Sequence, residues 1–138
     1  MNTPLDLIVQ TLRHAVDNVE LIYLFGSQIN GYAKASSDWD IAFKARSKLP
    51  PLQRWRIQED LANALQREVD LIDLLDASPV MQLQVIETGQ LLFGEIKHAD
   101  QFGMQVYSSY GDWQSRRREI MQSFVEKVKL LGDWRNDR

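Results

Sequence analysis

The stretch from residue 21 to residue 43 constrains the fold of this chain more than any other part of its sequence. An apolar run, Leu21 to Phe25, ends in Gly26-Ser27, and ten residues then precede a second run, Asp38 to Phe43. Apolar and β-branched residues are typical of strands, and glycine next to serine is typical of a turn. The stretch therefore predicts a strand, a turn, a loop and a second strand.

The second of these strands carries two acids. Successive side chains of an extended chain point to opposite faces, so Asp38 and Asp40 share one face, while Trp39, Ile41 and Phe43 share the other. The apolar face can be buried, which leaves two carboxylates side by side on the opposite face. Neighbouring carboxylates repel each other, and a hard divalent cation relieves this repulsion. Because Mg2+ is commonly held by one or two carboxylates together with substrate phosphates, we expect it to bind here.

Gly26 and Ser27 supply the groups that such phosphates need. Glycine lets the backbone approach a ligand closely and adopt unusual dihedral angles. Ser27 offers an N–H and a hydroxyl to phosphate oxygens, and a helix starting just after it would add its positive N-terminal end. We expect these two residues to bind a nucleotide. The alternative is an ordinary turn followed by a half-exposed strand with two solvated acids.

Together these motifs resemble the signature of the DNA polymerase beta-like nucleotidyltransferases: Gly26-Ser27, a spacer of ten residues, and Asp38-x-Asp40 at the start of a strand. The resemblance implies an α/β (α+β) fold, with a small mixed β-sheet flanked by helices. It also implies a third carboxylate, from a strand beside the one that carries the first two. It places this acid on Asp70, so that Asp38, Asp40 and Asp70 form the catalytic and metal-binding set. Asp73, on the other face of a regular strand, is the alternative if a bulge shifts the register.

The rest of the sequence alternates predicted helices and strands. Apolar spacing, caps and breakers predict helices at 3–19, 51–67 and 78–89 and strands at 68–75 and 91–94. Thr3, Pro4 and Asp6 have the pattern of a capping box at the start of the first helix. These elements form the core, residues 3–94, of a single predicted nucleotidyltransferase domain that covers residues 1–138.

From Asp100 onward, apolar residues recur at helical spacing. They predict a long C-terminal amphipathic helix within an extension at 98–131, and Gly111 is a candidate position for a break in it. We expect the first half of this helix to pack on its own domain. The second half contains Arg116-Arg117-Arg118, whose role the sequence leaves open, and we expect it to project and meet a partner.

Composition limits the classes of function. The net charge of −3 at pH 7 argues against direct nucleic-acid binding through a broad basic surface. The chain has no cysteine, which excludes disulfides, thiolate metal sites and a cysteine nucleophile and suits the cytoplasm. No apolar run approaches the length of a membrane span. We therefore expect a cytoplasmic protein without a membrane or nucleic-acid partner.

The short chain has no room for a separate acceptor-binding domain. In this respect it resembles the minimal nucleotidyltransferase antitoxins that are paired with HEPN-domain toxin ribonucleases. That resemblance implies transfer of AMP from ATP to a tyrosine of the toxin, two Mg2+ ions as cofactor, and a hetero-oligomer with the toxin. One alternative is a catalytically silent antitoxin that only occludes its partner, and another is a small-molecule nucleotidyltransferase of the aminoglycoside-modifying type. The sequence does not indicate the nucleotide preference, the modified residue, the number of AMP units or the stoichiometry of the complex.

Overall fold

A computed structural model describes residues 3–26 and 38–136 of the chain. In these described residues there are four strands and four helices. In chain order these elements are α1 (Pro4–Ala15), β1 (Val19–Phe25), β2 (Trp39–Ala45), α3 (Pro51–Leu65), β3 (Val69–Asp73), α4 (Pro79–Thr88), β4 (Gln90–Phe93) and α5 (Ile96–Asn136). None of the described helices is both long and apolar enough to cross a membrane.

The four strands form one mixed sheet in the order β3-β2-β1-β4. β2 runs parallel to β3, whereas β1 is antiparallel to both β2 and β4. Parallel neighbours cannot be joined by a hairpin, and α3 provides the crossover between β2 and β3. The predicted mixed sheet flanked by helices is confirmed.

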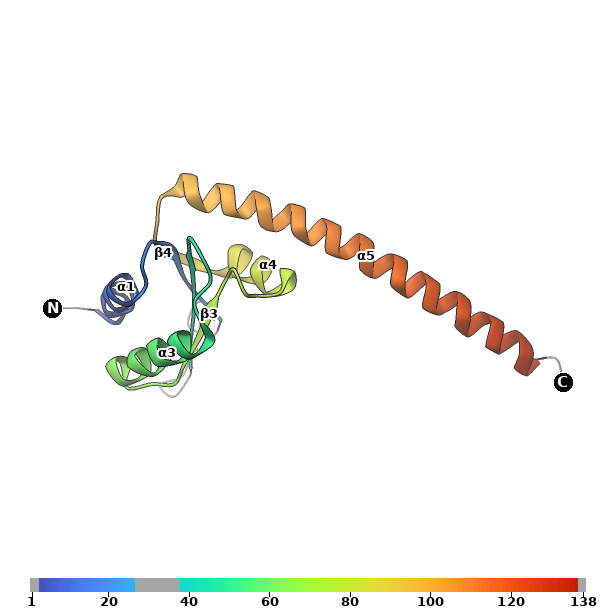
Figure 1. Cartoon of the computed structure of the whole chain (residues 1–138), viewed down its shortest axis with the longest axis horizontal. Helices are drawn as coiled ribbons and strands as arrows, with labels where there is room; N and C mark the ends of the chain where they lie inside the picture. The colour runs from blue at the N-terminus through green and yellow to red at the C-terminus, as the bar shows by residue number, and fades with distance from the viewer. Residues whose placement is uncertain (1–2, 27–37, 137–138) are drawn as a thin grey trace.

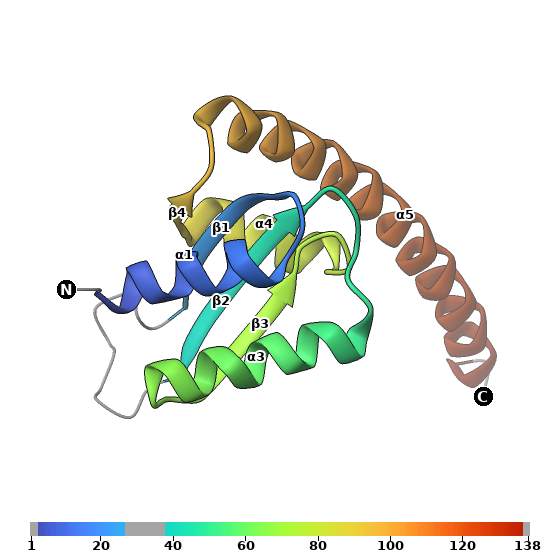
Figure 2. The same ribbon diagram turned by 60° about the vertical axis from the view of Figure 1, so that its left-hand side comes forward.

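Helices cover both faces of the sheet (Figures 1 and 2). One buried cluster joins α1 and α3 to the face that carries Ile41 and Phe43, with Trp39 partly buried beside it. The other joins α4 and the start of α5 to the face that carries Tyr23 and Ala42. The predicted burial of the apolar face of β2 is therefore confirmed. Strand alternation places Asp40 on the α4 side of the sheet, two residues before Ala42.

The first helix begins as predicted and ends earlier. The Thr3 side chain accepts a hydrogen bond from the N–H of Asp6, and the Asp6 carboxylate accepts one from the N–H of Thr3. The prediction of a helix through residue 19 was wrong, because α1 ends at Ala15 and Val16 is extended. Asn18 has a φ of 57°, a left-handed conformation that asparagine tolerates, and it turns the chain into β1.

α5 is one continuous helix from Ile96 to Asn136, without a break at Gly111. A single glycine costs a helix about 1 kcal/mol, which is too little to end one with strong helix formers on both sides. Phe102 and Val106 are buried against the body, as predicted for the first half. The second half extends away from the sheet (Figure 1), and its described side chains are exposed.

Candidate active site

Three acids approach one another at the end of the sheet where β2 and β3 begin. Asp40 in β2 is paired with Asp70 in the parallel strand β3. Residues paired in this way present their side chains on the same face, so the two carboxylates are neighbours. Asp38 lies two residues before Asp40 and is exposed, as is Asp70. The structure thus brings together all three acids predicted from the sequence.

Gly26, at the end of β1, lies against the carboxylate of Asp40. It follows Phe25, whose backbone is paired with that of Asp40, and its φ is +78°. A Cβ at this position would collide with the Asp40 carboxylate. The close approach and the positive φ both require glycine here. Ser27 and the helix expected after it lie outside the described residues.

The charges of the neighbouring acids act on Asp40. Burial raises the pKa of Asp40, and the nearby negative charges of Asp70 and Asp38 raise it further. Both ion pairs found in the described part of the chain, Lys44–Glu20 and Lys48–Asp76, involve other residues. The site therefore concentrates negative charge and favours a bound cation.

The donor set suits Mg2+ that is shared with a nucleotide. Across residues 3–26 and 38–136, no three acidic or histidine side chains are arranged to hold a metal ion by themselves. Mg2+ does not require such a cage, because it is often held by one or two carboxylates while waters and substrate phosphates complete its octahedron. Asp38, Asp40 and Asp70 could provide those carboxylates.

Asp73, the alternative third acid, has a structural environment. It is only 3% exposed. Its carboxylate accepts hydrogen bonds from the backbone N–H of Leu49 at 2.9 Å and of Leu75 at 3.0 Å. Through these hydrogen bonds it links the loop before α3 to the end of β3. The regular register from Trp39↔Val69 to Phe43↔Asp73 contains no bulge that would turn Asp73 toward Asp40.

Two residues of α3 hold the outer edge of β3. The Oε1 atom of Gln58 accepts the N–H of Leu71 at 3.0 Å, and the Nη1 atom of Arg54 donates to the carbonyl oxygen of Leu71 at 2.9 Å. An edge strand normally leaves such groups unpaired, so this clamp satisfies them and fixes the residue next to Asp70. Neither residue is a candidate on sequence grounds. Their only signal is two polar side chains four residues apart, which place them on one face of a helix.

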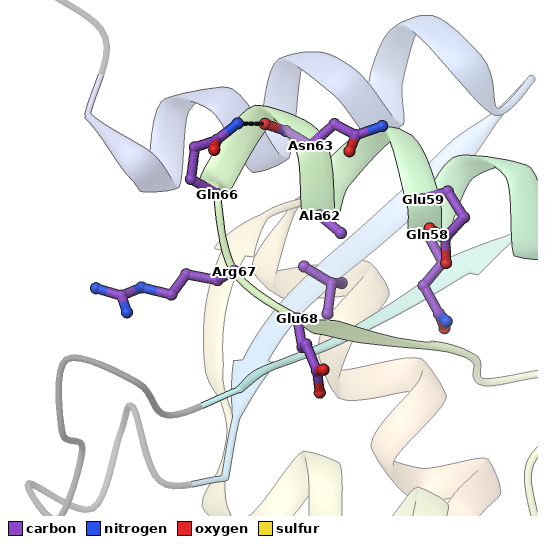
Figure 3. A pocket seen from close by; sticks show the side chains of 8 residues that line it. Gln58, Glu59, Ala62, Asn63, Gln66, Arg67 and Glu68 are labelled. Carbon is purple, nitrogen blue, oxygen red and sulfur yellow. Dashed lines mark hydrogen bonds between the residues drawn. The ribbon is translucent and has the colours of Figure 1, made fainter.

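A polar hollow lies near the start of β3 (Figure 3). It is lined mainly by the last turns of α3 and by Glu68 and Val69. Val69 packs in the cluster on the α1 and α3 side of the sheet, opposite the side to which Asp40 points. In Figure 3 the Arg67 side chain points away from those of Gln58 and Glu68, so the hollow contains no convergent set of charges. The start of β2 and β3, where the three acids lie, remains the candidate site.

The chain also matches a known protein family. Residues 7–98 match the family described as polymerase beta nucleotidyltransferases. The chain belongs to that family. The matched residues of this nucleotidyltransferase include Gly26 and the three acids, and they end near the start of α5.

A similar protein and two solved structures extend the comparison. The nucleotidyltransferase is 38% identical over 118 residues to protein adenylyltransferase MntA of Shewanella oneidensis. This alignment covers 86% of this chain and 85% of MntA. It superposes with a TM-score of 0.82 on a chain in a crystal structure of a toxin–antitoxin with AMP-PNP, at 36% identity, covering 88% of this chain and 98% of the other. A structure of a tri-AMPylated Shewanella oneidensis HEPN toxin in complex with its MNT antitoxin gives a TM-score of 0.76 at 34% identity, with 88% and 96% covered.

Proposed function

We propose that this chain is a magnesium-dependent protein adenylyltransferase and acts as an antitoxin. It transfers AMP from ATP to a tyrosine hydroxyl of a cognate HEPN-domain toxin and so neutralises the toxin. The observation that carries this proposal is the pairing of Asp40 with Asp70 on adjacent parallel strands, beside the close approach of Gly26. The similarity to MntA and to chains of toxin–antitoxin complexes supports the choice of a protein acceptor.

The proposed roles use the three acids at the start of β2 and β3 together with Gly26 and Ser27. Asp38 and Asp40 would hold Mg2+, and Asp70 would complete the site. When bound, Mg2+ supplies positive charge that offsets the charge of the phosphates and of the leaving group. Gly26 and Ser27 bind the β- and γ-phosphates through backbone N–H groups and the serine hydroxyl.

The transfer is an in-line displacement at phosphorus. The tyrosine oxygen forms a bond to the α-phosphorus of ATP, the bond from that phosphorus to the oxygen bridging to the β-phosphate breaks, and pyrophosphate leaves. Asp70 accepts the proton of the tyrosine hydroxyl, directly or through a water. Its exposed position next to Asp40 leaves room for an acceptor from another protein to approach.

The test compares the chain with its Asp38→Ala, Asp40→Ala and doubly substituted forms. Each is incubated with the HEPN-domain toxin, ATP and Mg2+, and the toxin is weighed by mass spectrometry. We expect the unaltered chain to add AMP units and all three variants to add none, with thermal unfolding showing that they remain folded. A chelator should stop transfer by the unaltered chain.

Transfer by the doubly substituted form would refute these roles. If that form adds no AMP and still protects RNA from the toxin, the chain neutralises by occlusion alone. Nucleotide transfer to an aminoglycoside in the absence of any protein partner would instead indicate a small-molecule enzyme.

A further inference from the structure

The second half of α5 exposes an apolar surface that the chain itself does not cover. Five large side chains on it, which we call the distal stripe, are each between 45 and 69% exposed: Ile120, Met121, Phe124, Val125 and Val128. Their spacing of one, three and four residues gathers them on one side of the helix. A contiguous apolar surface on a projecting helix is a mark of an interaction site.

The stripe continues the side of α5 that packs on the body. Ile120 and Phe124 follow the buried Phe102 and Val106 by 18 residues, which is about five turns of helix. They therefore point to the same side as Phe102 and Val106, the side of the helix that contacts α4 and β1 nearer the N-terminus. Beyond α4 this side has no described neighbour (Figure 1).

Charge indicates what kind of molecule covers the stripe. Residues 114–130 contain five arginines and lysines and two glutamates, a net charge of +3 in a chain whose total is −3. Antiparallel pairing of two copies would bring two such basic segments together, which is unfavourable. A protein groove with an apolar floor and acidic sides matches both the apolar stripe and the surrounding charge.

The position of the stripe relative to the acids indicates the role of that protein. Asp40 belongs to the α4 side of the sheet, and α5 leaves the body on that side (Figures 1 and 2). A protein bound along the stripe would lie beside α4, on the side of the sheet to which Asp40 points. We propose that the distal stripe is the docking surface for the acceptor protein, an acidic-sided groove of the toxin that this enzyme adenylylates. This inference rests on the proposed function and gives the enzyme a surface that holds its macromolecular substrate.

The test uses the full chain and its cognate HEPN-domain toxin. Phe124→Asp places a charge in the centre of the stripe, and Gln122→Asp places the same charge two residues away on the opposite side of the helix. Phe124→Ala removes the ring without adding charge. Circular dichroism checks that all three variants keep the helix, and titration measures the dissociation constant for the toxin.

We expect both Phe124 variants to raise the dissociation constant on the order of tenfold or more, and Gln122→Asp to change it little. In steady-state transfer, KM for the toxin should rise with the dissociation constant, while kcat and the affinity for AMP-PNP with Mg2+ stay unchanged. If toxin binding depends on Phe124 and no AMP is transferred, the docking surface stands and the proposed function fails.

Four outcomes would overturn the docking surface: toxin affinity that Phe124→Asp leaves unchanged, a chain that forms no complex with the toxin, a dimer of the chain alone that Phe124→Asp dissociates in sedimentation, or binding of single-stranded RNA that requires Phe124. Transfer that persists with unchanged toxin affinity would retain the enzyme and reject this surface.

Discussion

Two acids of β3, three residues apart, have opposite environments. Asp73 is buried at the end of the strand, and two backbone N–H groups donate hydrogen bonds to its carboxylate. Asp70 is exposed at the start of the strand and lies beside the carboxylate of Asp40, whose pKa is raised by burial and then by the charge of Asp70. The Asp73 carboxylate, which stabilises the fold, is surrounded by hydrogen-bond donors, whereas the carboxylates of Asp40 and Asp70 lie beside each other.

The two environments affect the stability of the folded chain differently, depending on whether a ligand is bound. The hydrogen bonds of Asp73 stabilise the folded chain whether or not a ligand is bound. Burial and the charges of Asp70 and Asp38 disfavour the ionised form of Asp40 in the chain alone, and a bound cation relieves this repulsion. Substitutions at the two ends of β3 should therefore separate activity from stability.

The largest effect is expected on transfer, from Asp70→Asn. The amide keeps the shape of the side chain and cannot accept the hydroxyl proton or provide a negative charge to a metal. We expect the rate of AMP transfer to fall on the order of 10²- to 10⁴-fold. The free energy of unfolding should change by less than about 0.5 kcal/mol, because the side chain is exposed. Quantitative mass spectrometry of the toxin and urea unfolding measure the two quantities, and a variant that loses stability while retaining its rate would reverse the comparison.

The second effect is on stability, from Asp73→Ala. The substitution leaves the N–H groups of Leu49 and Leu75 without their acceptor, and we expect a loss of about 2–4 kcal/mol. Transfer per folded molecule should be retained at a temperature where the variant is folded. Asp76→Ala is the control, because its exposed ion pair with Lys48, at 3.4 Å, should contribute less than about 1 kcal/mol. Equal losses from the two variants would contradict the structural role of Asp73.

The local pattern was enough to predict this contrast in part. Alternation along β2 correctly separated the buried Ile41 and Phe43 from Asp40, because side-chain period is set by the backbone alone. The choice of Asp70 over Asp73 as the neighbour of Asp40 came from the family resemblance, and it is confirmed as a matter of position, since β3 is regular and pairs Asp70 with Asp40. Its catalytic role stays a prediction.

Features that depend on distant contacts could not be predicted in this way. Arg54 donates to the carbonyl oxygen of Leu71, which lies 17 residues away in the sequence. Asp73 accepts from the N–H of Leu49, which lies 24 residues away. Nothing in the local pattern specifies either partner. The early end of α1 has the same origin. Val16 fits the helical spacing and is buried as expected, although it reaches the core from an extended segment. Periodicity predicted its burial correctly and its conformation incorrectly.

Gly26→Ala tests the close approach at the acid end. A left-handed φ costs a non-glycine residue about 1–2 kcal/mol, and the new Cβ would displace the Asp40 carboxylate. We expect a loss of stability of that size together with a loss of transfer. Gly111→Ala is the matched control, because no atom lies within 4 Å of a Cβ there and alanine favours a helix by about 1 kcal/mol. In a double-mutant cycle with Asp40→Ala, the stability cost of Gly26→Ala should become smaller, and strict additivity would argue against the contact.

The smallest effect is the pH dependence that Asp40 gives to stability. Its pKa is raised in the folded chain by burial and by Asp70 and Asp38, so the folded state holds this proton more tightly than the unfolded state does. The protonated side chain therefore contributes stability below the unfolded pKa, and this contribution is lost as pH rises through the folded value. Asp40→Asn should flatten that decline by well under about 1 kcal/mol, because the side chain is only partly buried.

Thermal unfolding from pH 4 to pH 8 measures this slope, with the exposed Asp112→Asn as the control for net charge. Without ligand, Asp40→Asn should be the more stable form at neutral pH. Adding Mg2+ and AMP-PNP should make the unaltered chain the more stable form. The unaltered chain gains stability from the bound ligand, and Asp40→Asn gains little. If the ligand stabilises both forms equally, the repulsion among these acids is unrelated to binding, and the contrast between the two ends of β3 loses its functional meaning.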